Sequence, residues 1–296
     1  DMEDKKSLAG AWVEAARPRT LPASVSPVLL GCALAYYDGM FDITPAVLCL
    51  LVALFAQIAS NFANDYFDFK KGADREDRLG PERAVTQGWI TPKAMLAGTF
   101  AMLGLACLSG LLLICFADWR LIWVGLAIAI CVLAYSAGPF PLAYNGLGDV
   151  CVLLFYGVIP VCFTYYIQTL SFSLLSFLLS VALGLLSVNI LVVNNYRDYV
   201  QDKAARKRTT IVLFGRVFYI LNECVAFLLV LPLVLDAPWW ILFLFGILFA
   251  LCFYTTRELL TLEGRALNRT LGHTARNVFL FAAVLSLLFV YVGSSL

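Results

Sequence analysis

The sequence has little charge and almost no histidine. Of its 296 residues only 14% are Asp, Glu, Lys or Arg, and His273 is the single histidine. A soluble globular domain usually carries about 25% charged residues, so the composition excludes that class. One histidine also excludes a cluster of histidine ligands for a metal. The chain has no basic stripe with interleaved aromatics and no zinc-ligand spacing, so we expect no nucleic-acid partner.

Paired cysteines are also missing. The chain has nine cysteines, but no two of them form a CxxC pair, and all lie within apolar runs. This pattern argues against a disulfide framework and against a cysteine metal site. We therefore expect the cysteines to act as small hydrophobic side chains in the core or against lipid.

Long apolar segments are abundant instead. Hydrophobic residues make up 61% of the chain, and the mean hydropathy is +0.85. A transmembrane helix needs roughly 17–25 mainly apolar residues. The sequence therefore predicts an all-α integral membrane protein, with one polytopic domain over residues 1–296 and nine transmembrane helices. The predicted spans are 21–37, 46–64, 93–116, 121–138, 147–167, 174–195, 216–235, 238–256 and 273–293.

The distribution of basic residues predicts the orientation of these helices. With nine spans, 20 of the 21 Lys and Arg residues fall on one side of the membrane, and only Arg120 lies on the other. Cytoplasmic segments carry an excess of Lys and Arg. We therefore expect a cytoplasmic N-terminus and a C-terminus outside the cell. The two long charged loops, 65–92 and 196–215, then lie on the cytoplasmic face.

Two acidic motifs occur where predicted helices meet these long loops. In the first, Asn61, Asn64, Asp65 and Asp68 are spaced by three or four residues, which places them on one face of a helix. Asp74 follows in the loop. Acidic groups at the edge of a bilayer are costly unless cations meet them, so they indicate a functional site.

The second motif lies 130 residues further along the chain. Asn194, Asp198 and Asp202 have i, i+4, i+8 spacing and share one helix face, and Asn195 lies beside them. We expect both motifs on the same side of the membrane, where their oxygen atoms could surround a divalent cation. Carboxylate oxygens suit Mg²⁺, which is commonly held by one or two carboxylates together with substrate phosphates.

Densely packed carboxylates repel one another, so positive groups are expected among them. The basic residues near the motifs are Lys70, Lys71, Arg75, Arg78, Arg83, Arg197, Lys203, Lys207 and Arg208. Carboxylates for metal and basic groups for anionic oxygens together suit a Mg-bound diphosphate. The apolar bundle could receive the hydrocarbon chain of a lipid diphosphate. Loss of the diphosphate would give an allylic cation, which aromatic rings such as Tyr135 or Phe140 could stabilise.

The two motifs resemble the aspartate-rich motifs of the UbiA-type intramembrane prenyltransferases. Three further stretches are similar to the 1,4-dihydroxy-2-naphthoate polyprenyltransferase branch of that family. They are the segments that begin at Arg17 (RPRTLP), Asp77 (DRLGPER) and Gly138 (GPFPLAYNGLGD). The first motif has Gly72 where the commoner family pattern has Asp, and Asp74 takes its place two residues later, which resembles the naphthoate branch.

This resemblance implies a helical bundle around a central cavity with a cytoplasmic cap of two long loops, in the bacterial inner membrane. It implies Mg²⁺ as the cofactor, with Asn64, Asp68, Asp74, Asp198 and Asp202 as ligands. It implies polyprenyl diphosphate as donor and 1,4-dihydroxy-2-naphthoate as acceptor, with loss of diphosphate and carbon dioxide. Membrane lipid surrounds the bundle.

The expected roles of the remaining residues follow from the same resemblance and from their position. Asp65, Asp68, Asp198 and Asp202 are the predicted catalytic acids, with Asp65 the candidate general base. The predicted substrate-binding residues are Asn61, Asn64, Lys70, Arg83, Tyr135, Asn194, Asn195, Arg197, Lys203, Lys207 and Arg19.

Two alternatives stay open at this stage. A prenyltransferase that uses another aromatic acceptor, such as 4-hydroxybenzoate or homogentisate, would have the same motifs. An ion-coupled transporter would also place acidic residues within the membrane, but it requires polar residues through the membrane depth. The third, fifth and eighth predicted helices have almost none.

Overall fold

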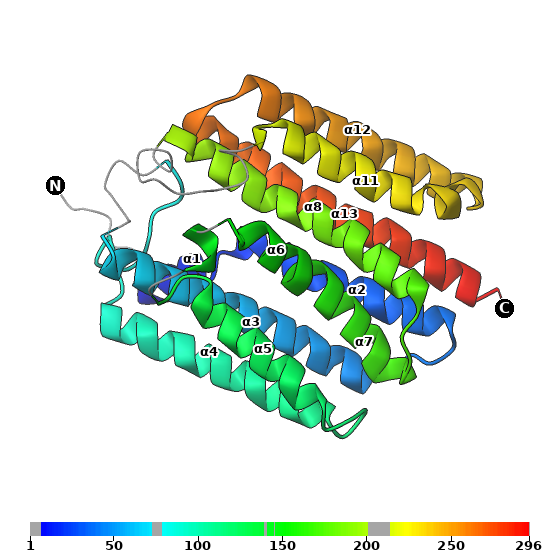
Figure 1. Ribbon diagram of the computed structural model, residues 1–296, viewed down its shortest axis with the longest axis horizontal. Helices are drawn as coiled ribbons and strands as arrows, with labels where there is room; N and C mark the ends of the chain where they lie inside the picture. The colour runs from blue at the N-terminus through cyan, green and yellow to red at the C-terminus, as the bar shows by residue number, and fades with distance from the viewer. Residues whose placement is uncertain (1–6, 73–78, 139–140, 145, 201–213, 296) are drawn as a thin grey trace.

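The computed structural model is all-helical in the residues that it describes, which are 7–72, 79–138, 141–144, 146–200 and 214–295 (Figure 1). The first half comprises α1 (Leu8–Ala16), η1 (Pro18–Thr20), α2 (Pro22–Tyr37), α3 (Ile43–Lys70), α4 (Pro92–Leu113) and α5 (Leu121–Ala134). The second half comprises η2 (Leu142–Tyr144), α6 (Gly148–Leu153), η3 (Leu154–Val158), α7 (Ile159–Thr169), α8 (Leu174–Arg197), α11 (Val217–Leu235), α12 (Trp239–Thr261), η4 (Gly264–Ala266) and α13 (Leu267–Gly293).

Short polar side chains begin several of these helices. Asp42 accepts a hydrogen bond from the Thr44 amide at 2.8 Å where α3 begins, and Ser173 accepts one from the Ser176 amide at 3.0 Å where α8 begins. Such N-cap bonds satisfy backbone donors that have no partner inside the helix. They fix the starting points of the two helices that carry the acidic motifs.

Each of the nine predicted apolar runs coincides with a helical segment, but fewer of them qualify as membrane spans. Among the described residues, seven helices are long and apolar enough to cross a membrane, and the number is eight if the bent pair Leu8–Thr20 and Pro22–Tyr37 counts as one span. The bend between these two segments is 53°. The predicted span 121–138 contains α5, which has only 14 residues, so the count of nine is not confirmed.

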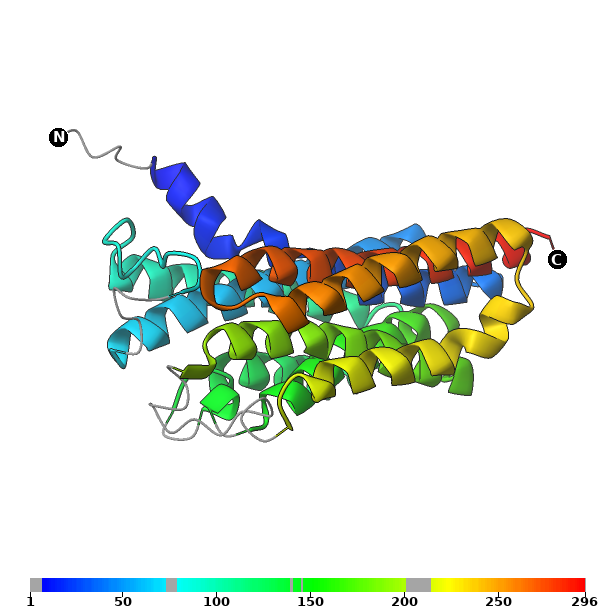
Figure 2. The same ribbon diagram turned by 90° about the horizontal axis from the view of Figure 1, so that it is seen from above.

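The helices run roughly side by side in one bundle (Figures 1 and 2). α3 packs along α4, α2 packs along α13, and α8 packs against α11 and α13. The largest apolar core joins α2, α7, α8, α11, α12 and α13. All nine cysteines are free thiols, as the sequence predicted.

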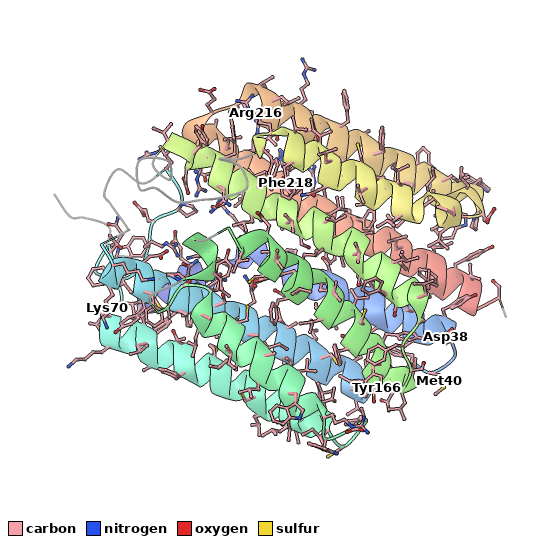
Figure 3. The ribbon with its side chains drawn as sticks, viewed as in Figure 1. Asp38, Met40, Lys70, Tyr166, Arg216 and Phe218 are labelled. Carbon is pink, nitrogen blue, oxygen red and sulfur yellow. The ribbon has the colours of Figure 1, made fainter. Side chains whose placement is uncertain are left out.

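Both motif-bearing helices end at the same end of the bundle. Figures 1 and 2 place the C-terminal ends of α3 and α8 at the end of the bundle where α1 lies, while the C-terminal end of α13 lies at the opposite end. In Figure 3, Lys70 and Arg216 mark the motif end, and Asp38, Met40 and Tyr166 mark the other. The fold thus brings the two acidic motifs to one end, as the topology predicted from the sequence requires.

Candidate functional site

A cavity of about 960 Å³ opens within the bundle at this end. Polar side chains reach it from the α1–η1 corner, from the end of α3, from the end of α8 and from the start of α13. Apolar side chains of α4, α5 and α7 line the rest. The cavity therefore has a polar part near the motifs and an apolar part along the helices. This division fits a ligand with an anionic head and a hydrocarbon tail.

The first motif is held by contacts with residues 83–85, in the second half of the first long loop. Asp68 forms an ion pair with Arg83 at 3.0 Å, and both residues are buried. Asp65 is 1% exposed and accepts hydrogen bonds from the backbone amides of Ala84 at 3.1 Å and Val85 at 3.4 Å. The motif thus positions the returning chain over the end of α3.

Asn61 and Asn64 take different partners on the cavity wall. The Asn61 side chain donates a hydrogen bond to the Ala16 carbonyl at 2.9 Å, which ties α3 to the α1–η1 corner. The side-chain oxygen of Asn64 accepts a hydrogen bond from the Ser136 hydroxyl at 3.1 Å. Lys71 donates to the Ser136 carbonyl at 2.7 Å. Desolvation lowers the pKa of Lys71, and the nearby Asp68 opposes that shift.

The second motif centres on a buried arginine. Arg197 is 3% exposed and forms a two-bond ion pair with Asp198, at 2.8 and 2.7 Å. Its guanidinium also donates to Asn194 and to Asn268, each at 2.8 Å. Asn268 in turn donates to the Leu79 carbonyl at 2.9 Å. One arginine therefore connects α8 with α13 and, through Asn268, with the first long loop at Leu79.

Several predicted site residues line the cavity: Arg19, Asn61, Asn64, Asp65, Arg83, Tyr135, Asn194 and Arg197. Asp68, Asn195 and Asp198 lie at the same helix ends but do not border the cavity as the described residues define it. Lys70 is exposed, with its ammonium 6.0 Å from the centre of the Tyr66 ring. Asp74, Asp202, Lys203 and Lys207 lie outside the described residues.

Sequence reasoning missed other polar residues on the cavity wall. Gln57 lies one turn before Asn61 on α3, and the Tyr156 hydroxyl donates a hydrogen bond to its side-chain oxygen. Asn268 was missed because it lies 71 residues from Arg197, its partner. An isolated amide or phenol inside an apolar run was the only signal for Gln57 and Tyr156, and such residues frequently serve only to join helices.

The acidic residues offer oxygen ligands, which suit Mg²⁺. Arg83 and Arg197 supply the positive charge that packed carboxylates require. A carboxylate has about four lone-pair sites, so an arginine contact leaves room for a metal. Within the described part of the chain, no three His, Cys, Asp or Glu side chains converge on one point, and two predicted ligands lie outside that part. The oxygen atoms that the Asp and Asn side chains offer therefore have the chemistry that a divalent cation requires.

Together, the fold and the cavity define an all-helical integral membrane protein whose cavity has Asn, Asp and Arg side chains at one end. The model of the UbiA prenyltransferase family matches residues 24–271, and the chain belongs to this family. It is 39% identical over 222 residues to the 1,4-dihydroxy-2-naphthoate octaprenyltransferase of Escherichia coli. The aligned region covers 73% of this chain and 72% of that protein.

Other relatives extend this comparison. The enzyme of the same name from Mycobacterium tuberculosis is 38% identical over 77% of this chain and 79% of its own length. The human UbiA prenyltransferase domain-containing protein 1 is 32% identical over 75% of this chain and 67% of its own length. A UbiA homolog from Archaeoglobus fulgidus, solved with GPP and Mg²⁺, has a TM-score of 0.63 at 18% identity and covers 93% of this chain and 99% of that one. The last likeness supports the fold.

Proposed function

We propose that the protein transfers a polyprenyl group from a prenyl diphosphate to 1,4-dihydroxy-2-naphthoate. A bond forms between the first prenyl carbon and the ring carbon that bears the carboxylate. The bond from that prenyl carbon to the diphosphate oxygen breaks, and the carboxylate leaves as carbon dioxide. The products are diphosphate and demethylmenaquinol, the reduced form of demethylmenaquinone.

The observation that carries this proposal is the joining of two acidic motifs to one large cavity with a polar end and an apolar body. The names of the relatives that match most of the chain support the acceptor. The same names argue against 4-hydroxybenzoate and homogentisate as acceptors and against a transporter.

The donor is held, on this proposal, by the motif end of the bundle. Asn64, Asp68, Asp74, Asp198 and Asp202 would hold Mg²⁺, and the solved homolog with GPP and Mg²⁺ supports this cofactor. When bound, Mg²⁺ neutralises the charge of the departing diphosphate. Arg83 and Arg197 fix the orientation of Asp68 and Asp198 through their ion pairs, and Lys203 and Lys207 would contact diphosphate oxygens.

The apolar wall and Tyr135 have separate roles in this scheme. Side chains of α4, α5 and α7 receive the prenyl chain and exclude water, which would otherwise capture an allylic cation. The Tyr135 ring borders the cavity, and its electron-rich face would stabilise that cation. Asp65 borders the cavity as a predicted catalytic residue, and its bonds to the Ala84 and Val85 amides also give it a structural role.

We extend the proposal to the membrane topology. The short α5 would complete nine crossings together with the bent α1–α2 segment, and the distribution of basic residues supports a cytoplasmic motif end. The loops 65–92 and 196–215 would then cap the cavity from the cytoplasm. In a bacterium this places the protein in the inner membrane.

The test uses the full-length protein purified in detergent, with a polyprenyl diphosphate, 1,4-dihydroxy-2-naphthoate and Mg²⁺. We expect prenylated product and carbon dioxide in equal amounts. EDTA and the Asp198→Ala substitution should each abolish both. Prenylation of 4-hydroxybenzoate but not of the naphthoate would show that the assigned acceptor is wrong. No prenylated product with any acceptor would overturn the proposed reaction.

A further inference from the structure

The corner between α1 and η1 places a basic side chain on the cavity wall, next to Asn61 at the start of the first motif. Arg17 at this corner borders the cavity and has a backbone φ of 54°. This left-handed conformation is unfavourable for a residue with a Cβ. Non-glycine residues in such conformations cluster at functional sites. The surrounding structure must therefore hold the corner in place.

Three hydrogen bonds hold it. The Arg17 amide donates to the Glu14 carbonyl at 3.0 Å, and the Thr20 hydroxyl donates to the Arg17 carbonyl at 3.0 Å. The Asn61 side chain of α3 donates to the Ala16 carbonyl. Arg17 thus has a fixed backbone beside a residue of the first motif, and it borders the cavity.

Arg17 shares the cavity wall with a polar pair. Gln57 and Tyr156 border the same cavity, and the Tyr156 hydroxyl donates to the Gln57 side chain. Gln57 lies 11 residues before Asp68 on α3, which is roughly 16 Å along the helix axis at 1.5 Å per residue. This pair is therefore deeper in the cavity than the ion pair of Asp68 with Arg83.

A buried hydroxyl also borders this part of the cavity. Ser24 on α2 is 4% exposed, and its hydroxyl has no hydrogen-bond partner within the described part of the chain. A buried polar atom without a partner destabilises the folded protein. A ligand that accepts or donates a hydrogen bond at this point would remove that destabilisation.

We propose that Arg17, Tyr156 and Ser24 form the acceptor subsite, in which Arg17 binds the carboxylate of the aromatic acceptor. A guanidinium matches a carboxylate with two parallel hydrogen bonds. Tyr156 and Ser24 then contact the ring hydroxyls, and Asn61 is a positioning residue that acts through the Ala16 carbonyl. This inference rests on the proposed function, because it assigns a site for that acceptor.

The experiment compares acceptors with and without the carboxylate. For the wild type and for Arg17→Asn, we would measure the KM for 1,4-dihydroxy-2-naphthoate, the KM for the prenyl diphosphate, and the inhibition constant of 1,4-dihydroxynaphthalene. Asn tolerates the left-handed backbone, so this variant should fold. The expected result is a rise of about tenfold or more in the KM for the naphthoate, as for loss of a charged hydrogen bond. The other two constants should change less than twofold.

Three further variants sharpen the test. Arg17→Lys keeps the charge without the paired geometry and should give an intermediate KM. Ser24→Ala should weaken binding of both naphthalene compounds. Arg120→Asn removes an exposed cation at the opposite end of the bundle and should leave all constants unchanged.

Each outcome decides between the assignments. If Arg17→Asn weakens the naphthoate and the carboxylate-free compound equally, Arg17 does not read the carboxylate and the inference is wrong. If it raises the KM for the prenyl diphosphate instead, Arg17 belongs to the donor site and the inference is also wrong. In both cases the wild type still makes product, so the proposed function stands. Failure of the wild type to prenylate any acceptor would overturn the proposed function itself.

Discussion

Replacing Arg197 by Met should destabilise the protein strongly. The Arg197 side chain is 1% exposed and forms hydrogen bonds with Asp198, Asn194 and Asn268. Methionine fills a similar volume but leaves the Asp198 charge without its partner. Breaking a buried ion pair costs about 3–5 kcal/mol. Because Asp198 is 21% exposed and retains some water, we expect a value near the lower limit, about 3 kcal/mol.

The assay is unfolding of the purified protein by SDS in mixed micelles. The measured signal is the loss of tertiary structure as the SDS concentration rises. The matched control is Arg120→Met, whose ion pair with Asp118 is exposed and 3.4 Å long. Exposed pairs contribute about 0–1 kcal/mol, so this variant should unfold almost as the wild type does. The double variant Arg197→Met, Asp198→Asn should recover part of the lost stability, since the uncompensated charge is gone.

Two results would refute this reasoning. A destabilisation of Arg197→Met no larger than that of Arg120→Met would mean that the buried pair is energetically unimportant. No recovery in the double variant would mean that the loss comes from the Asn194 and Asn268 contacts and not from the charge on Asp198. We also expect the double variant to remain inactive, because Asp198 is a predicted metal ligand.

Three further predictions concern the motif, the helix packing and the metal. Asp65→Asn should weaken the bonds to the Ala84 and Val85 amides and lower the free energy of unfolding by about 1–3 kcal/mol. Hydrogen exchange at both amides should become faster. Unchanged exchange would contradict the structural role of Asp65. Gly157→Ala should cost about 1–3 kcal/mol, because a Cβ there would lie 2.5 Å from the Gly184 Cα, and unfolding as in the wild type would show that the helices move apart freely. Removal of Mg²⁺ with EDTA should abolish product formation and Mg²⁺ alone should restore it; activity that persists in EDTA would contradict a metal-held donor.

The class of the protein and the ends of its motif helices were predictable from local sequence. Membrane spans are set by the length and apolarity of continuous runs, and each predicted run coincides with a helical segment. The i, i+3 and i, i+4 spacing of Asn61, Asn64, Asp65 and Asp68 predicted a polar helix end, and α3 reaches Lys70. Counting spans was less successful, because α5 is too short to qualify by length alone.

The tertiary structure alone decided which polar groups meet. Arg197 contacts Asn268, 71 residues away, and Tyr156 contacts Gln57, 99 residues away. Such partners depend on how helices pack, and helix periodicity contains no information about residues on other helices. Arg17 shows the same limit: the sequence predicts only a basic residue before a proline, while the structure places it on the cavity wall beside the bond from Asn61 to the Ala16 carbonyl. Local hydrophobicity thus determined that the chain enters a membrane, and packing between distant helices determined what its cavity is able to bind.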